Sequence, residues 1–552
     1  MILIPGYGQN LESIGKDDPI RINGGLSFSQ ILYKADGFES RRDPYSYFLT
    51  GNLTTSIYGF SIPLSFSVSN QSRSFQQPFN QFSLNPTYKW ATAHVGYSTM
   101  SFSPYTLSGH IFRGAGIELK PKKLHFSAMY GEMRRASQGD SVRGTSPTFA
   151  RRGMGFKTGY SEEGNFAELS VFHGADDVTS LAQVPRDNSM LPEENLAVGV
   201  SLGKQLFKKL SIEGEYTTSA VTRDSREKES SSDSLRWTER LIRSNITTDY
   251  FHAYRGSLNY QLKQYTIGGK YERIDPGYRT HGAYFFNSDL ENITVQFAGN
   301  WFDNKLTLNS SAGIQHDNLD RTKISTLSRM VGSINASFAP NERVSMTGSY
   351  SNFQSFTNVR SQFVQINQLT PYDNLDTLRF TQISQSVNLG LNYQLKASAS
   401  RQQFITLAFS VQDAADRQTD VTQNSGSRFY NLNTTYSLSL VPTKVNLGFS
   451  YNVSQNSAPD SQMLIHGPTF SLNKSLLENK LRLTVSSSYN ETSASNLNTN
   501  RLVNLRTMAS YRVGKRHNLT GGLVALQRTA PGSEAARYFR EYTGTFTYNY
   551  SF

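Results

Sequence analysis

Residues 542–552 read YTGTFTYNYSF and alternate between two kinds of side chain. Aromatic residues or glycine take every second position, and threonine, asparagine or serine stand between them. Because successive side chains of a β-strand point to opposite faces, one face of this strand is a ladder of aromatic rings and the other is polar. The stretch therefore predicts a strand that separates an apolar surrounding from a wet one.

The same alternation recurs along the chain, at residues 60–69, 292–301, 445–453 and 480–490. Strict alternation over about ten residues is typical of transmembrane β-strands. A soluble two-sheet sandwich also alternates and is the alternative. The polar positions here carry Ser, Thr, Asn and Gly rather than Lys and Glu, and no linker divides the chain. The pattern therefore favours one all-β, antiparallel transmembrane barrel.

Composition narrows the function classes. Of 552 residues, 37% are hydrophobic and 12% are aromatic, with 30 Tyr and 34 Phe, and Cys is absent. Without cysteine there is no disulfide framework and no thiolate metal site. No run of 18 apolar residues predicts a transmembrane helix, whereas a closed barrel also satisfies its backbone groups in lipid. The net charge of +12 comes from scattered Lys and Arg, so we expect no nucleic-acid partner.

Short turns alternate with longer polar loops, as in barrels with short periplasmic turns and long extracellular loops. Twelve turns predict about 26 strands with both termini in the periplasm. Residues 36–45 and 76–82 do not show the strand pattern clearly, which leaves 24 strands possible. The turns are expected at residues 58–59, 120–123, 161–165, 205–209, 302–305, 339–342, 441–444, 476–479 and 513–516, and near Trp90, Lys263 and Ser398.

The first residues, MILIPGYGQN, begin with a short apolar piece followed by Gly6-Tyr7-Gly8, a small-x-small pattern typical of a signal-peptidase site. We interpret residues 1–8 as the remnant of an export signal, with a free N-terminal tail as the alternative. Residues 9–18 are then a periplasmic segment, and residues 19–552 the transmembrane barrel.

From residue 10 onward the chain resembles bacterial outer-membrane β-barrel proteins, and its Asn-, Ser- and Tyr-rich composition is similar to that of large Bacteroidota barrels. Phe546, Tyr548, Tyr550 and Phe552 match the C-terminal assembly signal of that class. The resemblance implies insertion into outer-membrane lipid by the barrel assembly machinery of a diderm bacterium. It identifies no sub-family: strands begin near Arg21, which leaves no room for the plug domain of TonB-dependent receptors.

Motifs that carry chemistry are few. The nine histidines form no HxxxH or HExxH pattern, so we expect neither a metal site, a cofactor nor an enzyme. The sequence DNLD occurs twice in expected outer loops, and its carboxylates are calcium candidates: Asp317, Asp320, Asp373 and Asp376. Paired carboxylates are also common turn residues, which is the other explanation.

One expected outer loop contains a helix-like stretch, residues 233–244, with the sequence DSLRWTERLIRS. Its apolar residues are Leu235, Trp237, Leu241 and Ile242. Such a segment either folds into the lumen as a constriction or remains a solvated surface loop.

The size of the barrel bears on its function. About 26 strands spaced ~4.8 Å apart and tilted ~40° enclose a lumen roughly 50 Å across. Such a hole requires closing, so we expect inward loops, a plug or a surface lipoprotein partner. The inner residues are mostly neutral, which favours a conduit for bulky or polar substrates such as a polypeptide or glycan. The alternative is a non-conducting barrel that docks surface proteins in an outer-membrane complex.

Overall fold

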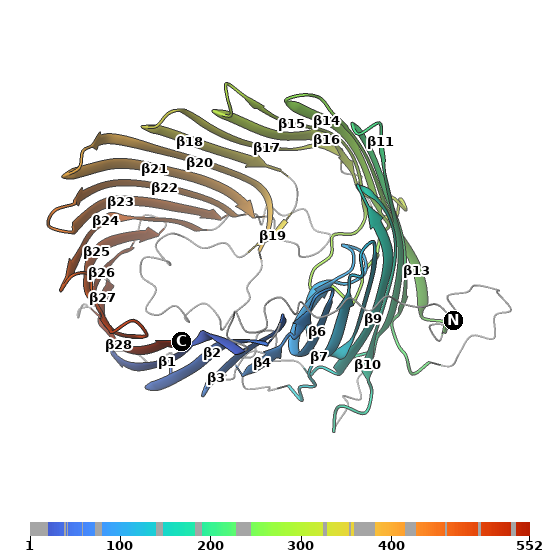
Figure 1. Ribbon diagram of the computed structural model, residues 1–552, viewed down its shortest axis with the longest axis horizontal. Helices are drawn as coiled ribbons and strands as arrows, with labels where there is room; N and C mark the ends of the chain where they lie inside the picture. Colours follow the sequence, from blue (N-terminus) through green and yellow to red (C-terminus); the bar gives the residue numbers. More distant parts are fainter. Residues whose placement is uncertain are drawn as a thin grey trace.

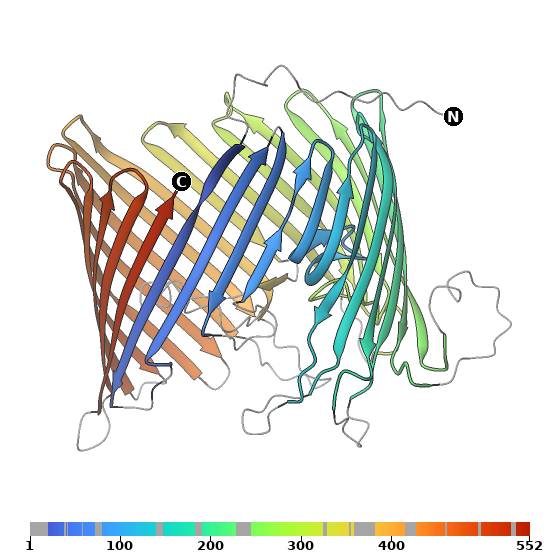
Figure 2. The same cartoon turned by 60° about the horizontal axis from the view of Figure 1, so that its bottom comes forward.

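A computed structural model describes residues 20–37, 40, 42–57, 59–71, 80–139, 147–182, 190–227, 244–323, 328–352, 355–357, 381–414, 427–458, 461–494, 498–530 and 537–552. These residues form one closed antiparallel β-barrel (Figures 1 and 2). No described helix is long and apolar enough to cross a membrane. The strands are β1 (Ile20–Asp36), β2 (Tyr45–Ile57), β3 (Phe60–Ser69), β4 (Gln81–Leu84), β5 (Thr87–Tyr88), β6 (Ala91–Ser101), β7 (Ser108–Leu119), β8 (Leu124–Arg134), β9 (Ala150–Glu162), β10 (Asn165–Asp177), β11 (Glu194–Leu206), β12 (Leu210–Thr222), β13 (Thr248–Gln261), β14 (Tyr265–Ile274), β15 (Leu290–Trp301), β16 (Leu306–His316), β17 (Ser328–Asn341), β18 (Val344–Ser351), β19 (Ser355–Thr357), β20 (Thr381–Ala397), β21 (Arg401–Ala414), β22 (Ser427–Leu440), β23 (Val445–Ala458), β24 (Ser461–Leu476), β25 (Leu481–Ala494), β26 (Asn498–Val513), β27 (His517–Ala530) and β28 (Arg537–Ser551).

The described strands make 26 crossings, because β4 with β5 and β18 with β19 are each one interrupted crossing. Each strand pairs with its neighbours in the chain, and β1 pairs with β28 to close the ring. In that closing register Phe28 lies opposite Tyr548. The prediction of an all-β barrel of about 26 strands is confirmed.

Of the two segments that left 24 strands possible, residues 36–45 connect β1 to β2, and residues 76–82 include the start of β4, while residues 72–79 lie outside the described residues. Asn85 and Pro86 interrupt the crossing made by β4 and β5, and proline has no N–H to give to a strand ladder. The interruption keeps one bond to the neighbouring strand, because the Asn85 N–H donates to the carbonyl of Pro63 at 2.9 Å. The alternation is therefore lost in sequence although the wall continues.

Short hairpin turns connect strands at one end of the described barrel, and Figure 2 shows them at its upper end. They follow β2, β5, β7, β9, β11, β13, β15, β17, β20, β22, β24 and β26, which are the twelve positions predicted. The strand ends that the longer connections join lie at the opposite end. Several of the short turns place non-glycine residues at positive φ, as tight hairpins require, among them Phe302, Asp303 and Asn304.

Large apolar side chains line the outward face of the wall. Cross-strand partners share a face, so the row through Phe449, Tyr436 and Phe470 continues from strand to strand. Many of these side chains are exposed although they are apolar, as expected for a surface that meets hydrocarbon rather than water. Examples are Tyr130, Leu202, Tyr216, Val295, Ile314, Leu389, Phe449, Phe470, Leu505, Leu523 and Phe546.

Candidate functional site in the lumen

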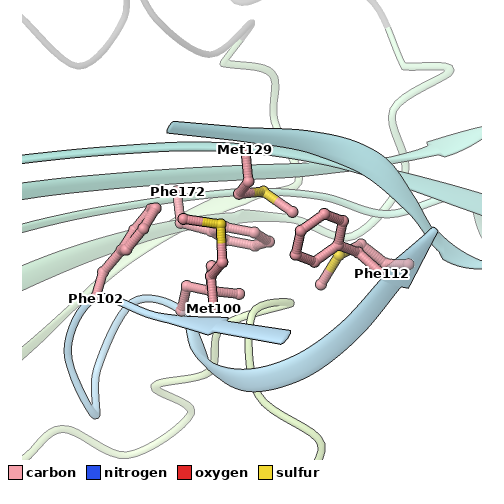
Figure 3. Close-up of a cluster of buried hydrophobic side chains, with 7 residues drawn as sticks. Met100, Phe102, Phe112, Met129 and Phe172 are labelled. Carbon is pink, nitrogen blue, oxygen red and sulfur yellow. The ribbon is translucent and has the colours of Figure 1, made fainter. Parts of the chain in front are cut away.

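The connection between β6 and β7, residues 102–107, carries the sequence FSPYTL and folds into the barrel (Figure 1). Phe102, Tyr105 and Leu107 are buried, which is unusual in a loop that should meet water. Figure 3 shows Phe102 beside Met100, Phe112, Met129 and Phe172 in one apolar cluster. Burial of these side chains holds the end of the β6–β7 hairpin against the inner wall.

A second connection, residues 275–289 between β14 and β15, joins the first. The hydroxyl of Tyr278 donates to the carbonyl of Tyr105 at 2.6 Å, and that of Thr280 donates to the carbonyl of Thr106 at 2.7 Å. The N–H of Ser108 donates to the carbonyl of Gly282 at 2.9 Å. We call residues 102–107 and 275–289 together the inner shelf.

Polar bonds fasten the inner shelf to the wall. The Tyr105 hydroxyl donates to the Glu272 carboxylate on β14, and the Arg255 guanidinium lies 5.7 Å from the centre of the Tyr105 ring. The fully buried Asn195 on β11 accepts from the N–H of His281 at 3.0 Å. Because a buried polar group without a partner is costly, these bonds fix the position of the inner shelf.

The wall opens locally beside the inner shelf. β7 pairs with β6 as far as Ser108, but it pairs with β8 only from Arg113 to Leu119. The freed end of β7 contacts the inner shelf instead: the His110 ring stacks on Tyr284 with centroids 4.0 Å apart, and the Ile111 N–H donates to the Tyr284 hydroxyl. This end of the β6–β7 hairpin therefore lies against the inner shelf instead of pairing with β8.

A pocket of about 370 Å³ occupies this opening. Guanidinium groups dominate its polar lining, and aromatic side chains supply much of the remainder. We call it the arginine pocket, and its lining includes Tyr97, His110, Phe112, Arg113, Glu132, Met133, Arg134, Arg135, Arg151, Glu193, Arg279, His281, Tyr284 and Phe286.

Ion pairs tie the pocket wall to the inner shelf. Arg134 and Arg151 both bind Asp176, whose side chain is almost fully buried, with N···O distances of 3.0 and 2.6 Å. Glu193 accepts from Arg151 at 3.1 Å and from Arg279 of the inner shelf at 2.7 Å. The network connects five charged side chains, and four of them, Arg134, Arg151, Glu193 and Arg279, line the arginine pocket.

Glu193 and His281, which lie outside the strands, have perturbed pKa values. Burial alone would raise the pKa of Glu193, but a hydrogen bond from His281 and the charges of Arg279 and Arg151 lower it to about 2. Burial lowers the pKa of His281, and Arg151 acts in the same direction, while Glu193 and Asp176 oppose them. Glu193 is therefore ionised and His281 neutral near pH 7.

The opposite side of the lumen has different chemistry. Along β22 to β26 most inward residues are neutral amides and hydroxyls, among them the buried Asn433, Asn452 and Asn490, although Arg482 and Arg506 share this face. Asn433 Nδ2 donates to Asn452 Oδ1, while the Asn490 side chain has no hydrogen-bond partner among the described residues. A second hollow, of about 580 Å³, is lined on β16 to β22 by Asn, Ser, Thr and Gly with few apolar residues. One half of the lumen wall is thus rich in ion pairs and aromatic residues, and the other is mostly neutral and polar.

The residues singled out in the sequence do not meet at this site. Lys323 binds Asp317 at 3.2 Å and also contacts Asp289, and Asp320 accepts from the Thr322 N–H at 3.1 Å. Asp373 and Asp376 lie outside the described residues, as do Leu235, Trp237, Leu241 and Ile242. The described residues contain no group of three metal-ligating side chains. Calcium binding and the lumen constriction at residues 233–244 remain predictions.

Histidines have carboxylate neighbours, which sequence reasoning did not anticipate. The ring Nε2 atoms lie 2.7 to 3.3 Å from carboxylate oxygens in four pairs. The pairs are His94 with Glu118, His125 with Glu168, His173 with Glu194, and His281 with Glu193.

Sequence reasoning also missed the inner shelf and the arginine pocket. Two signals were available: the doubled arginines Arg134-Arg135 and Arg151-Arg152, and aromatic residues in stretches that interrupt the strand pattern. Neither reveals that residues 105 and 278 meet, because no periodicity links two loops that lie far apart in sequence.

The closed ring of strands and its apolar outer face decide the architecture. The chain is a closed antiparallel β-barrel with the apolar outer face of a transmembrane barrel. No protein-family model matches it, and no curated protein matches it. Among solved structures, the translocation pore of the P pilus usher PapC aligns over 96% of this barrel and 99% of its own chain, at 10% identity and a TM-score of 0.38. OccAB2 of Acinetobacter baumannii aligns over 96% and 98%, at 10% identity and a TM-score of 0.33. A mutant of the ferric enterobactin receptor PfeA of Pseudomonas aeruginosa aligns over 96% and 80%, at 10% identity and a TM-score of 0.42. At this level of similarity the alignments say nothing about substrate or partner.

Proposed function

We propose that this barrel is an outer-membrane conduit for polar solutes or chain segments, with a lumen that the inner shelf narrows from one side. The single observation that carries the proposal is the inward folding of two apolar connections, residues 102–107 and 275–289. A barrel that only scaffolded other proteins would not need buried tyrosines and ion pairs to hold loops inside its lumen. No chemical reaction is part of this proposal.

The wall opposite the inner shelf supports the same function. Neutral amides and hydroxyls exchange hydrogen bonds with a passing polar molecule without trapping it by charge. The amide side chains of Asn309, Asn335 and Asn388 line the hollow of about 580 Å³ on this wall. Groups that line an open hollow can exchange hydrogen bonds with a polar solute.

Location and partners follow as parts of the proposal. An apolar outer belt on a closed barrel suits the outer membrane of a diderm bacterium, with short turns and both termini in the periplasm. The assembly machinery would insert the barrel through its last strand. A plug or surface lipoprotein would complete the closure that the inner shelf begins.

Conductance of the purified barrel in planar bilayers tests the proposal. Replacing residues 276–288 by a short Gly-Ser linker should raise single-channel conductance, because the described obstruction is removed. Tyr489→Ala, which alters an outward aromatic residue on β25, is the matched control and should leave conductance unchanged. Heat-modifiable migration on gels verifies that each variant still forms a barrel.

The alternative is the non-conducting docking barrel. If barrels with and without residues 276–288 are both silent, the conduit is wrong and the docking role is favoured. If the shelf deletion conducts more while the wild-type barrel conducts little, the inner shelf is the obstruction.

A further inference from the structure

The arginine pocket contains more positive charge than its own carboxylates neutralise. Five arginines line it, and the described carboxylates that pair with them are Asp176, Glu193 and Glu132. Among the described residues, an excess of two positive charges therefore remains in a recess with aromatic walls. Such an excess in a partly desolvated recess attracts an anion.

Two of these arginines, Arg134 and Arg279, also keep N–H donors that have no partner among the described residues. Arg134 uses its Nη2 on Asp176 and its Nε on the carbonyl of Phe149, and Arg279 uses its Nη2 on Glu193. A guanidinium has five N–H donors, so each of these arginines keeps N–H groups without a partner among the described residues. The ion pairs also hold the two side chains in place, so a ligand would meet donors that are already positioned.

Arg135 adds a charge that no described carboxylate neutralises. Its guanidinium donates to the Tyr97 hydroxyl and lies 6.0 Å from the centre of the Tyr97 ring. Tyr284 and Phe286 of the inner shelf contribute flat apolar surface to the same recess. The recess thus combines forked cationic donors with faces on which a ring can lie.

We infer that the arginine pocket binds a small organic oxyanion from the lumen: a molecule of sugar size that carries one carboxylate or phosphate group. The planar fork of arginine matches both groups in two-point hydrogen bonding. A recess of about 370 Å³ falls at the small end of ligand-binding cavities, which suits one or two rings. This inference rests on the proposed function, since it names the class of solute that the conduit would retain.

Equilibrium binding to the detergent-solubilised barrel tests the inference without any conductance measurement. The probes are glucuronate, glucose 6-phosphate and glucose, which share a ring and differ in the anionic group. By ligand-observed nuclear magnetic resonance, the two anionic sugars should bind and glucose should not. Equal binding of all three, or of none, overturns the inference, whereas the proposed conduit fails only in the bilayer experiment.

Variants locate the binding. Arg135→Gln leaves no described carboxylate without its partner, and Arg134→Gln leaves Asp176 bound to Arg151. Each should weaken binding of glucuronate and glucose 6-phosphate about tenfold, the effect of removing one charged hydrogen bond. Arg223→Gln is the matched control, because Arg223 also pairs with a carboxylate, that of Asp249, and does not line the arginine pocket. Equal losses in all three variants mean that only the overall charge matters and overturn the assignment.

A last experiment distinguishes a lumen solute from a lipid headgroup as the source of the anion. Vesicles of phosphatidate and of phosphatidylcholine are compared as competitors of glucose 6-phosphate. Failure of both to compete supports a lumen solute. Displacement by phosphatidate alone shows that the pocket takes a lipid headgroup and overturns the assignment to a lumen solute.

Discussion

At the scale of single residues, Tyr278 joins the two halves of the inner shelf. Its side chain is buried, and its hydroxyl donates to the carbonyl of Tyr105. Tyr278→Phe leaves that carbonyl without its donor, at a cost of about 1–3 kcal/mol. We expect faster hydrogen exchange in residues 102–107 and 275–289, with barrel strands unchanged. Tyr542→Phe on the outward face is the control. Equal exchange rates in both variants would show that the Tyr278 hydroxyl does not hold the inner shelf together.

Leu447 and Asn446 are neighbours on β23 that point to opposite faces. The strand register places Leu447 with the outward row and Asn446 toward the lumen. Leu447 is the third residue of β23 from the short-turn end, so Leu447→Arg should cost roughly 1–2 kcal/mol, less than at a mid-membrane position, whereas Asn446→Arg should cost far less. The measurement is the urea dependence of unfolding in lipid vesicles. Equal destabilisation would mean that the assigned faces are wrong.

His281 makes the inner shelf sensitive to acid. Its folded pKa lies below its ordinary value of 6.5, so its contribution to stability is complete above pH 6.5 and declines as the pH falls toward the folded pKa. Glu193, with a folded pKa of about 2 against an ordinary 4.5, loses its contribution only below about pH 4.5. Amide protection factors in residues 275–289 should fall between pH 7.5 and 5. In His281→Asn that difference should shrink, and a difference of wild-type size would remove His281 as its cause.

At the scale of elements, β28 has two duties: it closes the ring, and it carries the motif that matches the assembly signal. Beyond its last paired residues, Gly24 and Phe552 exchange backbone hydrogen bonds of 3.2 and 3.1 Å. Replacing Tyr550 and Phe552 together by serine should lower the amount of assembled barrel and raise degraded protein, because an exposed strand edge is recognised through its side chains as well as its backbone. Heat-modifiable migration of membrane fractions measures this, and unchanged assembly would contradict the signal.

The strands could be predicted from sequence, and the inner shelf could not. β23 and β28 alternate so regularly that their faces follow from side-chain type alone, since a strand has period two. The crossing through Asn85 and Pro86 has no such pattern, because these two residues interrupt the strand. Its continuity depends on the hydrogen bond from Asn85 to Pro63 on β3, which the sequence does not reveal. The inner shelf depends on contacts between residues 105 and 278, which only the closed ring brings together.

At the scale of the whole molecule, the lumen wall is rich in ion pairs near β7 to β15 and mostly neutral near β16 to β28. The loop at residues 233–244, with Trp237, is the obstruction predicted from sequence, and the inner shelf is the obstruction that we propose from the structure. If both narrow the lumen, deleting residues 233–244 should raise conductance further in the barrel that already lacks residues 276–288. If deleting residues 233–244 changes conductance neither in the wild-type barrel nor in the barrel that lacks residues 276–288, the loop takes no part in closure.

The pairing of β1 with β28 also determines when this protein can fold. The Ser29 and Thr547 hydroxyls lie 3.0 Å apart although 518 positions separate them in the chain. A contact of such sequence separation is slow to form, because the chain loses the entropy of loop closure before the contact stabilises it. Until synthesis and export of the last strand are finished, the first strand keeps an open edge that invites pairing with other chains. We therefore expect the immature polypeptide to need a holding chaperone, and its abundance to depend on the speed of delivery to the membrane more than on the stability of the finished ring.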